Sequence, residues 1–179
     1  MSERSVPSLG LQNGTVVVVP YDPRWAEEYS KAADELYDAL EANIIAVHHV
    51  GSTAVPGLSA KPILDLLVSV SDLEQSLEII PQIEALNYEF RPKEDIPDRH
   101  FLRRKHGGIR THHLSLAEPT SHYHTVTLAF RDALRENAAM AREYSELKLE
   151  LARRFPNDRP SYIEGKTAFV ERVLRDTGF

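Results

Sequence analysis

The chain has 179 residues, of which 42% are apolar and 27% are charged, and its formal net charge is −6. This size and composition suit one globular domain, and the acidic balance argues against a general nucleic-acid binder, which usually presents a basic face to phosphates. Because the sequence contains no cysteine, disulfides, thiol catalysis and cysteine-ligated metal sites are excluded.

The first ten residues, MSERSVPSLG, lack an apolar stretch of signal-peptide length. The chain also contains no apolar run of the roughly 20 residues needed to cross a bilayer. We therefore expect a cytoplasmic protein that does not bind membranes. The sequence leaves its oligomeric state undefined.

The first elements expected along the chain are a strand and a helix. Residues 15–20 contain four consecutive valines and predict a strand. Asp22 then predicts an N-cap, with Pro23 in the first position of a helix that runs to about residue 42. Apolar residues recur along it at helical spacing, Trp25 among them, so that one face is expected to be buried.

Two strands and an interrupted helix are expected next. Residues 43–50 predict a strand that ends at a Gly-Ser turn. Residues 62–70 are apolar at both alternating sets of positions, which is typical of a strand covered on both faces. A helix is predicted over residues 73–86, and Pro81 should kink or divide it.

The remainder of the chain predicts three short strands and then helices. The strands are expected at residues 88–92, 100–105 and 111–118, and the helices at 122–136, 138–155 and 160–176. Gly107-Gly108 predicts a turn between the last two strands, Pro156-Asn157 a break between helices, and Ser161 with Glu164 a capping box. This order predicts an α+β fold in one domain, residues 1–179, with a sheet-containing core at about 14–120 and a helical extension at about 121–177.

Asp65 carries the strongest functional signal, because it places a charge inside the apolar strand at 62–70. Such a carboxylate is costly unless it is paired, bound to a metal or open to a cleft. From the residues alone, a buried ion pair, for example with Lys61, is supported as well as a functional cleft.

Gly51 and Ser52 follow the strand at 43–50 and precede Thr53. A glycine lets the backbone approach a ligand, and consecutive N–H groups with a serine hydroxyl can hold a phosphate oxygen. An ordinary tight turn is the more common role of such a pair. If the strands at 43–50 and 62–70 are neighbours, however, Ser52 and Asp65 meet at one sheet edge, which favours a site.

The combination of a Gly-Ser turn with a carboxylate in an apolar strand resembles the nucleotidyltransferase superfamily signature. Within it, the chain resembles the GrpB-like family, which has a related module attached to dephospho-coenzyme A kinases. The segments that carry the resemblance are HHVGSTAVPGLSAKPILDLLV at 48–68, THHLSLAEP at 111–119 and EYSELKLELARRFPNDRPSYIEGKTAFV at 143–170.

The resemblance implies a nucleotidyltransferase-like mixed sheet flanked by helices, with a helical C-terminal extension. It also implies a site in which carboxylates hold Mg²⁺ or Mn²⁺ beside the nucleotide phosphates. Asp65 is then the expected catalytic residue. The expected metal ligands are Asp65 and His113, and the expected phosphate-binding residues are Gly51, Ser52, Thr53, Lys61 and Arg103.

Leu67 departs from the pattern of active nucleotidyltransferases, which have a second carboxylate at this position. A two-metal transferase would lose a ligand shared by both ions. His113 is a candidate replacement: strand alternation places it on one face with Ser115, opposite His112. The family pattern has a histidine at the position of Ser115, so a paired histidine site is incomplete here. Glu118 is a further acidic candidate, although a surface role is more common.

Other charged residues have ordinary explanations. Residues 91–110 carry seven Lys or Arg against three Asp or Glu, which fits a solvated surface as well as an anion-binding face. His122 and His124 are expected at the surface. Lys166, on the last predicted helix, could reach the site, and Arg131 and Asp132 could form structural pairs with other elements. For all three, a position facing solvent is favoured, because charged helix residues usually face solvent.

The leading functional prediction is binding of a nucleotide or another phosphate-bearing small molecule with a divalent metal. Nucleotidyl transfer to an acceptor is the reaction that the resemblance adds to it. The alternative is a non-catalytic ligand-sensing or protein-interaction module that kept the fold and lost the two-metal chemistry. The sequence does not define the acceptor or the base preference.

Overall fold

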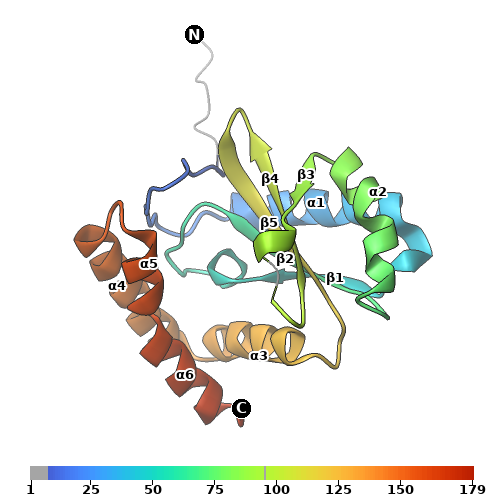
Figure 1. Cartoon of the computed structure of the whole chain (residues 1–179). Coiled ribbons are helices and arrows are strands. Elements are labelled where there is room, and N and C mark those ends of the chain that lie inside the picture. Colours follow the sequence, from blue (N-terminus) through green and yellow to red (C-terminus); the bar gives the residue numbers. More distant parts are fainter. Residues whose placement is uncertain (1–7, 95) are drawn as a thin grey trace.

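The computed structural model describes residues 8–94 and 96–179. Across these residues a five-stranded sheet forms the centre of the molecule, with the strand order β1-β2-β5-β4-β3 (Figure 1). Strands β2 and β5 are parallel, whereas the other neighbouring pairs are antiparallel, so the sheet is mixed as predicted. The strands are β1 (Ala46–Val50), β2 (Leu64–Ser69), β3 (Tyr88–Phe90), β4 (His100–His106) and β5 (Ile109–Ala117).

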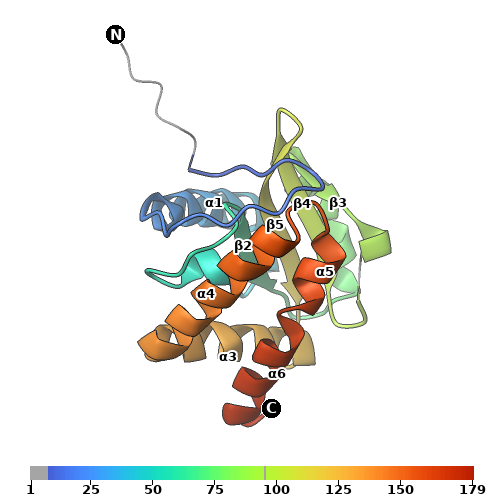
Figure 2. The same ribbon diagram turned by 90° about the vertical axis from the view of Figure 1, so that its left-hand side faces the viewer.

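Helices cover both faces of this sheet and extend beyond it. Helices α1 and α2 lie over one face, α3 lies over the other, and α4, α5 and α6 form a separate group beside the sheet (Figures 1 and 2). The α+β class and the helical C-terminal extension are therefore confirmed. The helices are α1 (Arg24–Leu40), α2 (Ile80–Ala85), α3 (His122–Glu136), α4 (Ala138–Arg154), α5 (Arg159–Glu164) and α6 (Thr167–Asp176).

The two faces of β2 differ in chemistry because successive strand residues point in opposite directions. On the α1 and α2 side, Leu66 and Val68 belong to the main hydrophobic core. On the α3 side, the register places Asp65 beside His113 and Leu67 beside Ser115. The polar side chains of the central strands thus gather on the face that the C-terminal helices border.

Residues 15–20 do not form a strand, and the prediction for them is wrong. Val19 makes an isolated bridge with Ala60, and the Val16 N–H donates to the Pro156 carbonyl over 2.8 Å. Val16 packs against Leu151 and Tyr162, with Val18 beside it, so these two valines contact the C-terminal helices instead of a neighbouring strand. Val17 is exposed.

The last predicted helix is divided into α5 and α6 around Gly165. The Asp158 side chain caps α5 by accepting from the Ser161 N–H over 3.2 Å, so Ser161 lies inside the helix and the predicted capping box is wrong. The predicted break at Pro156-Asn157 is confirmed. Pro81 also divides its helix as predicted: a 3₁₀ turn (Gln75–Ile79) precedes α2, whose first turn contains the proline.

A search of the described helices finds none that is both long and apolar enough to span a membrane.

Candidate functional site

The Gly-Ser turn and Asp65 meet at one edge of the sheet, as the sequence predicts. Strands β1 and β2 pair so that Val50 lies opposite Asp65, and the turn follows Val50 directly. Gly51 has φ +70°, a conformation that favours glycine, and a Cβ placed on it would overlap Asp65 Oδ2. Glycine is needed here because the carboxylate of Asp65 fills the space beside it.

Ser52 and Asp65 line one cavity of about 560 Å³ between this sheet edge and the C-terminal helices. The Asp65 side chain is 41% exposed, so it opens into the cavity instead of being sealed in the core. We call this cavity the basic cleft. Its charged lining residues are Lys61, Asp65, Arg99, Lys148, Arg159 and Lys166.

His113 holds the Asp65 carboxylate from the neighbouring strand. Its Nδ1 donates to Asp65 Oδ1 over 3.0 Å, and its ring packs near Phe101. Burial favours the neutral form of Asp65, but the hydrogen bond from His113 and the positive charges around it, that of Lys61 included, outweigh this effect and lower the pKa of the carboxyl group. The carboxylate is therefore ionised at neutral pH.

Lys148 reaches the Gly-Ser turn from α4 and is only 2% exposed. Its Nζ donates to Ser52 Oγ over 2.8 Å and to the Ser59 carbonyl over 2.5 Å, and it lies 4.5 Å from the centre of the Tyr144 ring. Burial, followed by the charges of other lysines in the cleft, lowers the pKa of Lys148 to about 6.

Lys61 and Lys166 both lie against the buried ring of Tyr162. Their Nζ atoms are 5.5 Å and 4.7 Å from its centre. Burial lowers the pKa of Lys61 and, with the charge of Lys61, lowers the pKa of Lys166 to about 8; Arg159 acts in the same direction on both lysines. The ammonium groups of the cleft are thus close enough to repel one another.

The charge of the cleft is opposite to that of the chain. Within the described part of the chain, its lining has five Lys or Arg side chains against one carboxylate, although the whole chain has a net charge of −6. An excess of cations in a partly desolvated cavity raises the local concentration of anions and favours their binding. The cleft is therefore built to accept an anion.

Most of the predicted site residues come together in this cleft. Gly51, Ser52, Thr53, Lys61, Asp65 and His113 all line it. Arg103 is not in its lining and forms an ion pair with Glu89 over 3.4 Å, while Arg99 from the same basic segment takes a place in the cleft. Thr53 is buried, and its hydroxyl is hydrogen-bonded to His49 Nε2 over 3.0 Å.

The sequence reading missed several residues of the cleft. Lys166 lines it instead of facing solvent, and Lys148, Arg159 and Tyr162 were not selected. A signal for Lys148 was present, since it follows Tyr144 by four residues and precedes Leu151 by three, on the buried stripe of α4. A lysine on such a stripe requires a polar partner.

Two further predictions concern side chains near the sheet. His124 is buried, contrary to the prediction, because its Nε2 and His48 Nε2 both bond Ser69 Oγ, over 2.8 Å and 3.1 Å. Arg131 pairs with its neighbour Asp132, with 2.7 Å between Nε and Oδ1, and also donates to the His49 carbonyl on β1 over 3.1 Å.

The residues of the cleft do not fit a Mg²⁺ site of the two-metal type. Magnesium requires about six oxygen ligands in octahedral geometry. Leu67 is fully buried in a cluster with Val50 and Ala117, and Glu118 accepts from the Leu73 N–H over 2.9 Å instead of entering the cleft. Residues 8–94 and 96–179 contain no group of three or more His, Cys, Asp or Glu side chains that could hold a metal ion.

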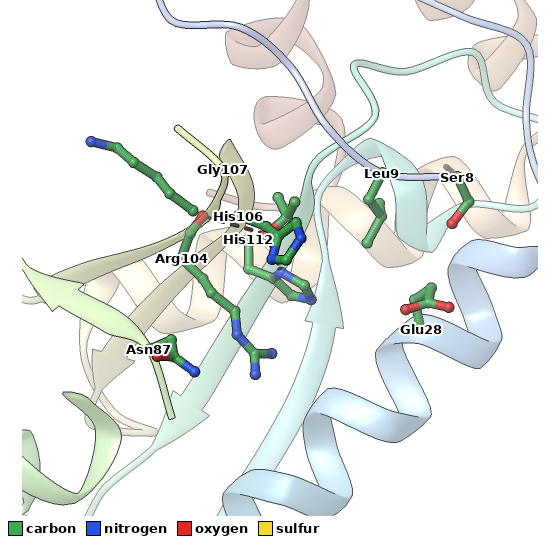
Figure 3. Close-up of a pocket in the computed structure, with 10 residues that line it drawn as sticks. Ser8, Leu9, Glu28, Asn87, Arg104, His106, Gly107 and His112 are labelled. Carbon is green, nitrogen blue, oxygen red and sulfur yellow. Dashed lines mark hydrogen bonds between the residues drawn. The ribbon is translucent and has the colours of Figure 1, made fainter. Parts of the chain in front are cut away.

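A second cavity, of about 540 Å³, lies between the β4–β5 hairpin and α1 (Figure 3). Arg104 and His112 line one side of it and Glu28 the other. Arg104 forms an ion pair with Glu35 over 2.8 Å and lies over the Tyr88 ring. Because Glu35 already neutralises the charge of Arg104, we favour the basic cleft as the functional site.

Comparison with known proteins places the chain among close relatives. Residues 15–176 match the sequence pattern of the family described as GrpB protein. A UPF0157 protein of Pseudomonas aeruginosa is 37% identical over 165 residues, which cover 89% of this chain and 66% of that protein. The UPF0157 protein YqkA of Bacillus subtilis is 34% identical over 156 residues, which cover 87% of this chain and 45% of YqkA. The chain thus spans less than two thirds of either relative.

A solved structure shows the same fold over nearly the whole chain. The crystal structure of conserved protein GrpB from Enterococcus faecalis has a TM-score of 0.83 and 35% sequence identity, covering 90% of this chain and 96% of that chain. A dephospho-CoA kinase of Mycolicibacterium paratuberculosis is 33% identical over 81 residues, or 44% of this chain and 20% of the kinase. The predicted relationship to a module of such kinases is confirmed.

Proposed function

The chain belongs to the GrpB protein family, and from this premise we propose that the basic cleft binds a phosphate-bearing small molecule such as a nucleotide. The observation that carries the proposal is the convergence of Lys61, Lys148 and Lys166 on one cavity beside the Gly-Ser turn. Each of these lysines has a lowered pKa because it is removed from water near other cations. A bound anion would relieve this cost, since it supplies the opposite charge that the cavity lacks.

The chemistry of the lining fits phosphate better than a carboxylate-bearing metabolite. Ammonium groups present three donors each and bind phosphate oxygens as point charges, and Arg159 adds a planar guanidinium that can bond two oxygens at once. The Ser52 hydroxyl already faces Lys148, so a phosphate near the turn would contact both groups. An aromatic surface, the ring of Tyr162, lies below two of the lysines.

Binding is the part of the predicted function that the geometry supports, and nucleotidyl transfer is not. The resemblance to nucleotidyltransferases places a second carboxylate where this chain has Leu67, and that side chain is buried under α3. This observation favours the alternative of a ligand-sensing module that kept the phosphate-binding half of the site. Asp65 and His113 then set the charge and shape of the cleft.

Thermal unfolding with a panel of ligands tests the proposal. ATP, UTP, coenzyme A and pyrophosphate are compared with adenosine, which has no phosphate. We expect at least one phosphate compound to raise the melting temperature, because a ligand that binds the folded state stabilises it by mass action. Lys61→Met should reduce this rise, whereas Lys31→Met should not, since Lys31 pairs with Glu28 at the surface. Equal stabilisation by adenosine, or no stabilisation by any phosphate compound, would show the proposal to be wrong.

A further inference from the structure

The form in which the ligand binds can be inferred from the charges of the basic cleft, and this inference rests on the proposed function. We propose that the cleft binds a di- or triphosphate as the metal-free anion. In this arrangement the ammonium groups of Lys61, Lys148 and Lys166 contact the phosphate oxygens that Mg²⁺ would otherwise coordinate.

The single carboxylate of the cleft is already committed to protein partners. Asp65 Oδ1 accepts a hydrogen bond from His113 Nδ1 over 3.0 Å. Oδ2 lies against Gly51 so closely that a Cβ there would overlap it. A metal ion at Asp65 would compete with His113 for Oδ1 or bind Oδ2 alone, and Leu67 supplies no second carboxylate.

Asp65 is also the counter-ion of the lysines. Its negative charge acts on Lys61, Lys148 and Lys166, opposing the effect of burial on each. A divalent cation placed at the carboxylate would be repelled by the ammonium groups of Lys61 and Lys166, on which the charge of Asp65 acts. The lysines, and not a metal ion, are then the groups that can neutralise the negative charge of a ligand.

The arrangement of the cations indicates how many phosphates the ligand carries. Lys148 lies at the Gly-Ser turn, bonded to Ser52, whereas Lys61 and Lys166 lie over the Tyr162 ring. Lysines from the loop before β2, from α4 and from the start of α6 thus line one cavity. Because these groups come from three different elements, two or three linked phosphates offer more oxygens to them than a single phosphate does.

This proposal and a metal-dependent site predict opposite effects of two changes. If Mg²⁺ bridges Asp65 and the ligand, removing the metal or the carboxylate abolishes binding. If lysines bind the free anion, Mg²⁺ competes by chelating the same oxygens. Removing the Asp65 charge then takes away a repulsion between carboxylate and phosphate.

Isothermal titration calorimetry of the full chain with inorganic pyrophosphate separates the two cases. One titration contains EDTA, and the other contains excess MgCl₂, with KCl used to equalise the ionic strength, because salt screens the charges of the cleft. We expect binding in EDTA and an affinity at least about tenfold weaker in MgCl₂. Asp65→Asn should bind pyrophosphate at least as tightly as the wild type, and Lys166→Met at least about tenfold more weakly, which corresponds to about 1.4 kcal/mol.

Each outcome has one meaning. Binding that requires MgCl₂ and is lost in Asp65→Asn overturns the metal-free proposal and leaves phosphate binding in place. No binding of pyrophosphate in either buffer overturns the metal-free proposal but not the proposed function, which fails only if no phosphate compound of the ligand panel stabilises the protein. The comparison of the two buffers needs only the wild-type protein, so it decides the question even if Asp65→Asn does not fold.

Discussion

Gly51 lies against the carboxylate of Asp65 with no space for a side chain between them. We therefore predict that Gly51→Ala destabilises the protein and displaces Asp65. Gly57→Ala is a matched control, because Gly57 also has a positive φ, of +79°, but its Cβ would meet no atom within 4 Å. Both variants place an alanine at a positive φ, so each carries backbone strain of about 1–3 kcal/mol.

The overlap with Asp65 should lower the free energy of unfolding of Gly51→Ala by about 1–3 kcal/mol beyond that of Gly57→Ala. Urea unfolding of both variants measures this difference. Equal losses would mean that Asp65 moves aside at no cost and that the two residues are not tightly packed.

Lys148 provides a second prediction, which concerns stability above neutral pH. Burial lowers its pKa from 10.5 in the unfolded chain to about 6 in the folded protein. Between these values the unfolded state binds one proton more than the folded state, so stability should rise as the pH increases from 6 toward 9. Lys166, with a pKa of about 8, adds to the rise at the upper end of this range.

The free energy of unfolding is measured with urea from pH 6 to pH 9, and its slope against pH gives the difference in bound protons between the two states. In Lys148→Met the slope should fall by about one proton per molecule. Lys31→Met serves as the control, since its side chain is 65% exposed and should leave the slope unchanged. An identical slope in Lys148→Met would show that Lys148 keeps its proton in the folded protein.

The five strands and the β4–β5 hairpin were predictable from the sequence, because β-branched and apolar runs and Gly-Gly turns act locally. The parallel pairing of β2 with β5 joins distant segments and was not predicted. Residues 15–20 show the limit of such patterns. Val16 and Val18 pack against Leu151 and Tyr162, more than 130 residues away in the sequence, and a local pattern does not reveal such a distant partner. The high β propensity of valine predicted a strand here, but tertiary packing determined the conformation of the segment.

Only the part of the candidate site that lies on the sheet was predictable, because sequence patterns do not reveal contacts between distant elements. The Gly-Ser turn and Asp65 lie on paired strands, so strand adjacency was enough to bring them together. His113 was a candidate from the family resemblance, and the β2–β5 pairing that places it beside Asp65 appears only in the structure. Lys148, Arg159 and Lys166 reach the cleft only because α4, α5 and α6 fold back beside the sheet edge. Periodicity shows which face of a helix is buried but not which element it packs against.

A third prediction concerns the stability of the protein at acidic pH. Burial lowers the pKa of His49 and of His112 to about 4, below the value of 6.5 expected in the unfolded chain. As the pH falls from 6.5 to about 4, the unfolded state gains protons that these folded-state imidazoles do not accept. Stability should therefore decrease across this range. His49→Gln should flatten the decrease measured by urea unfolding, whereas substitution of the exposed His122 by glutamine should not.

The buried hydroxyl of Ser69 gives a fourth prediction. It bonds the imidazoles of both His48 and His124, and Ser69 is only 1% exposed. Ser69→Ala leaves two buried ring nitrogens without this partner, which should cost about 1–3 kcal/mol of unfolding free energy. Ser30→Ala is the control, because the Ser30 hydroxyl bonds the Ala26 carbonyl on an exposed helix face. Similar small losses in both variants would show that water replaces Ser69 in the network.

Leu67 tests whether this fold can still accept the second carboxylate of a nucleotidyltransferase site. Its side chain is fully buried against Val50 and Ala117, with Tyr123 and Leu128 of α3 packed over the cluster. A carboxylate at this position would lose its water without gaining a partner, which is among the most costly changes in a protein core. We expect Leu67→Asp to unfold or to lose most of its stability, and MgCl₂ not to restore it.

Leu67→Met is the control for this substitution, because it conserves volume and should cost less than about 1.5 kcal/mol. Melting temperatures of both variants with and without MgCl₂ give the answer. If Leu67→Asp folds and MgCl₂ raises its melting temperature above that of the metal-free variant, the cluster under α3 can open to a metal. A single substitution at Leu67 would then restore a metal ligand. In that case the lysines would not be the only groups of the cleft able to neutralise a phosphate.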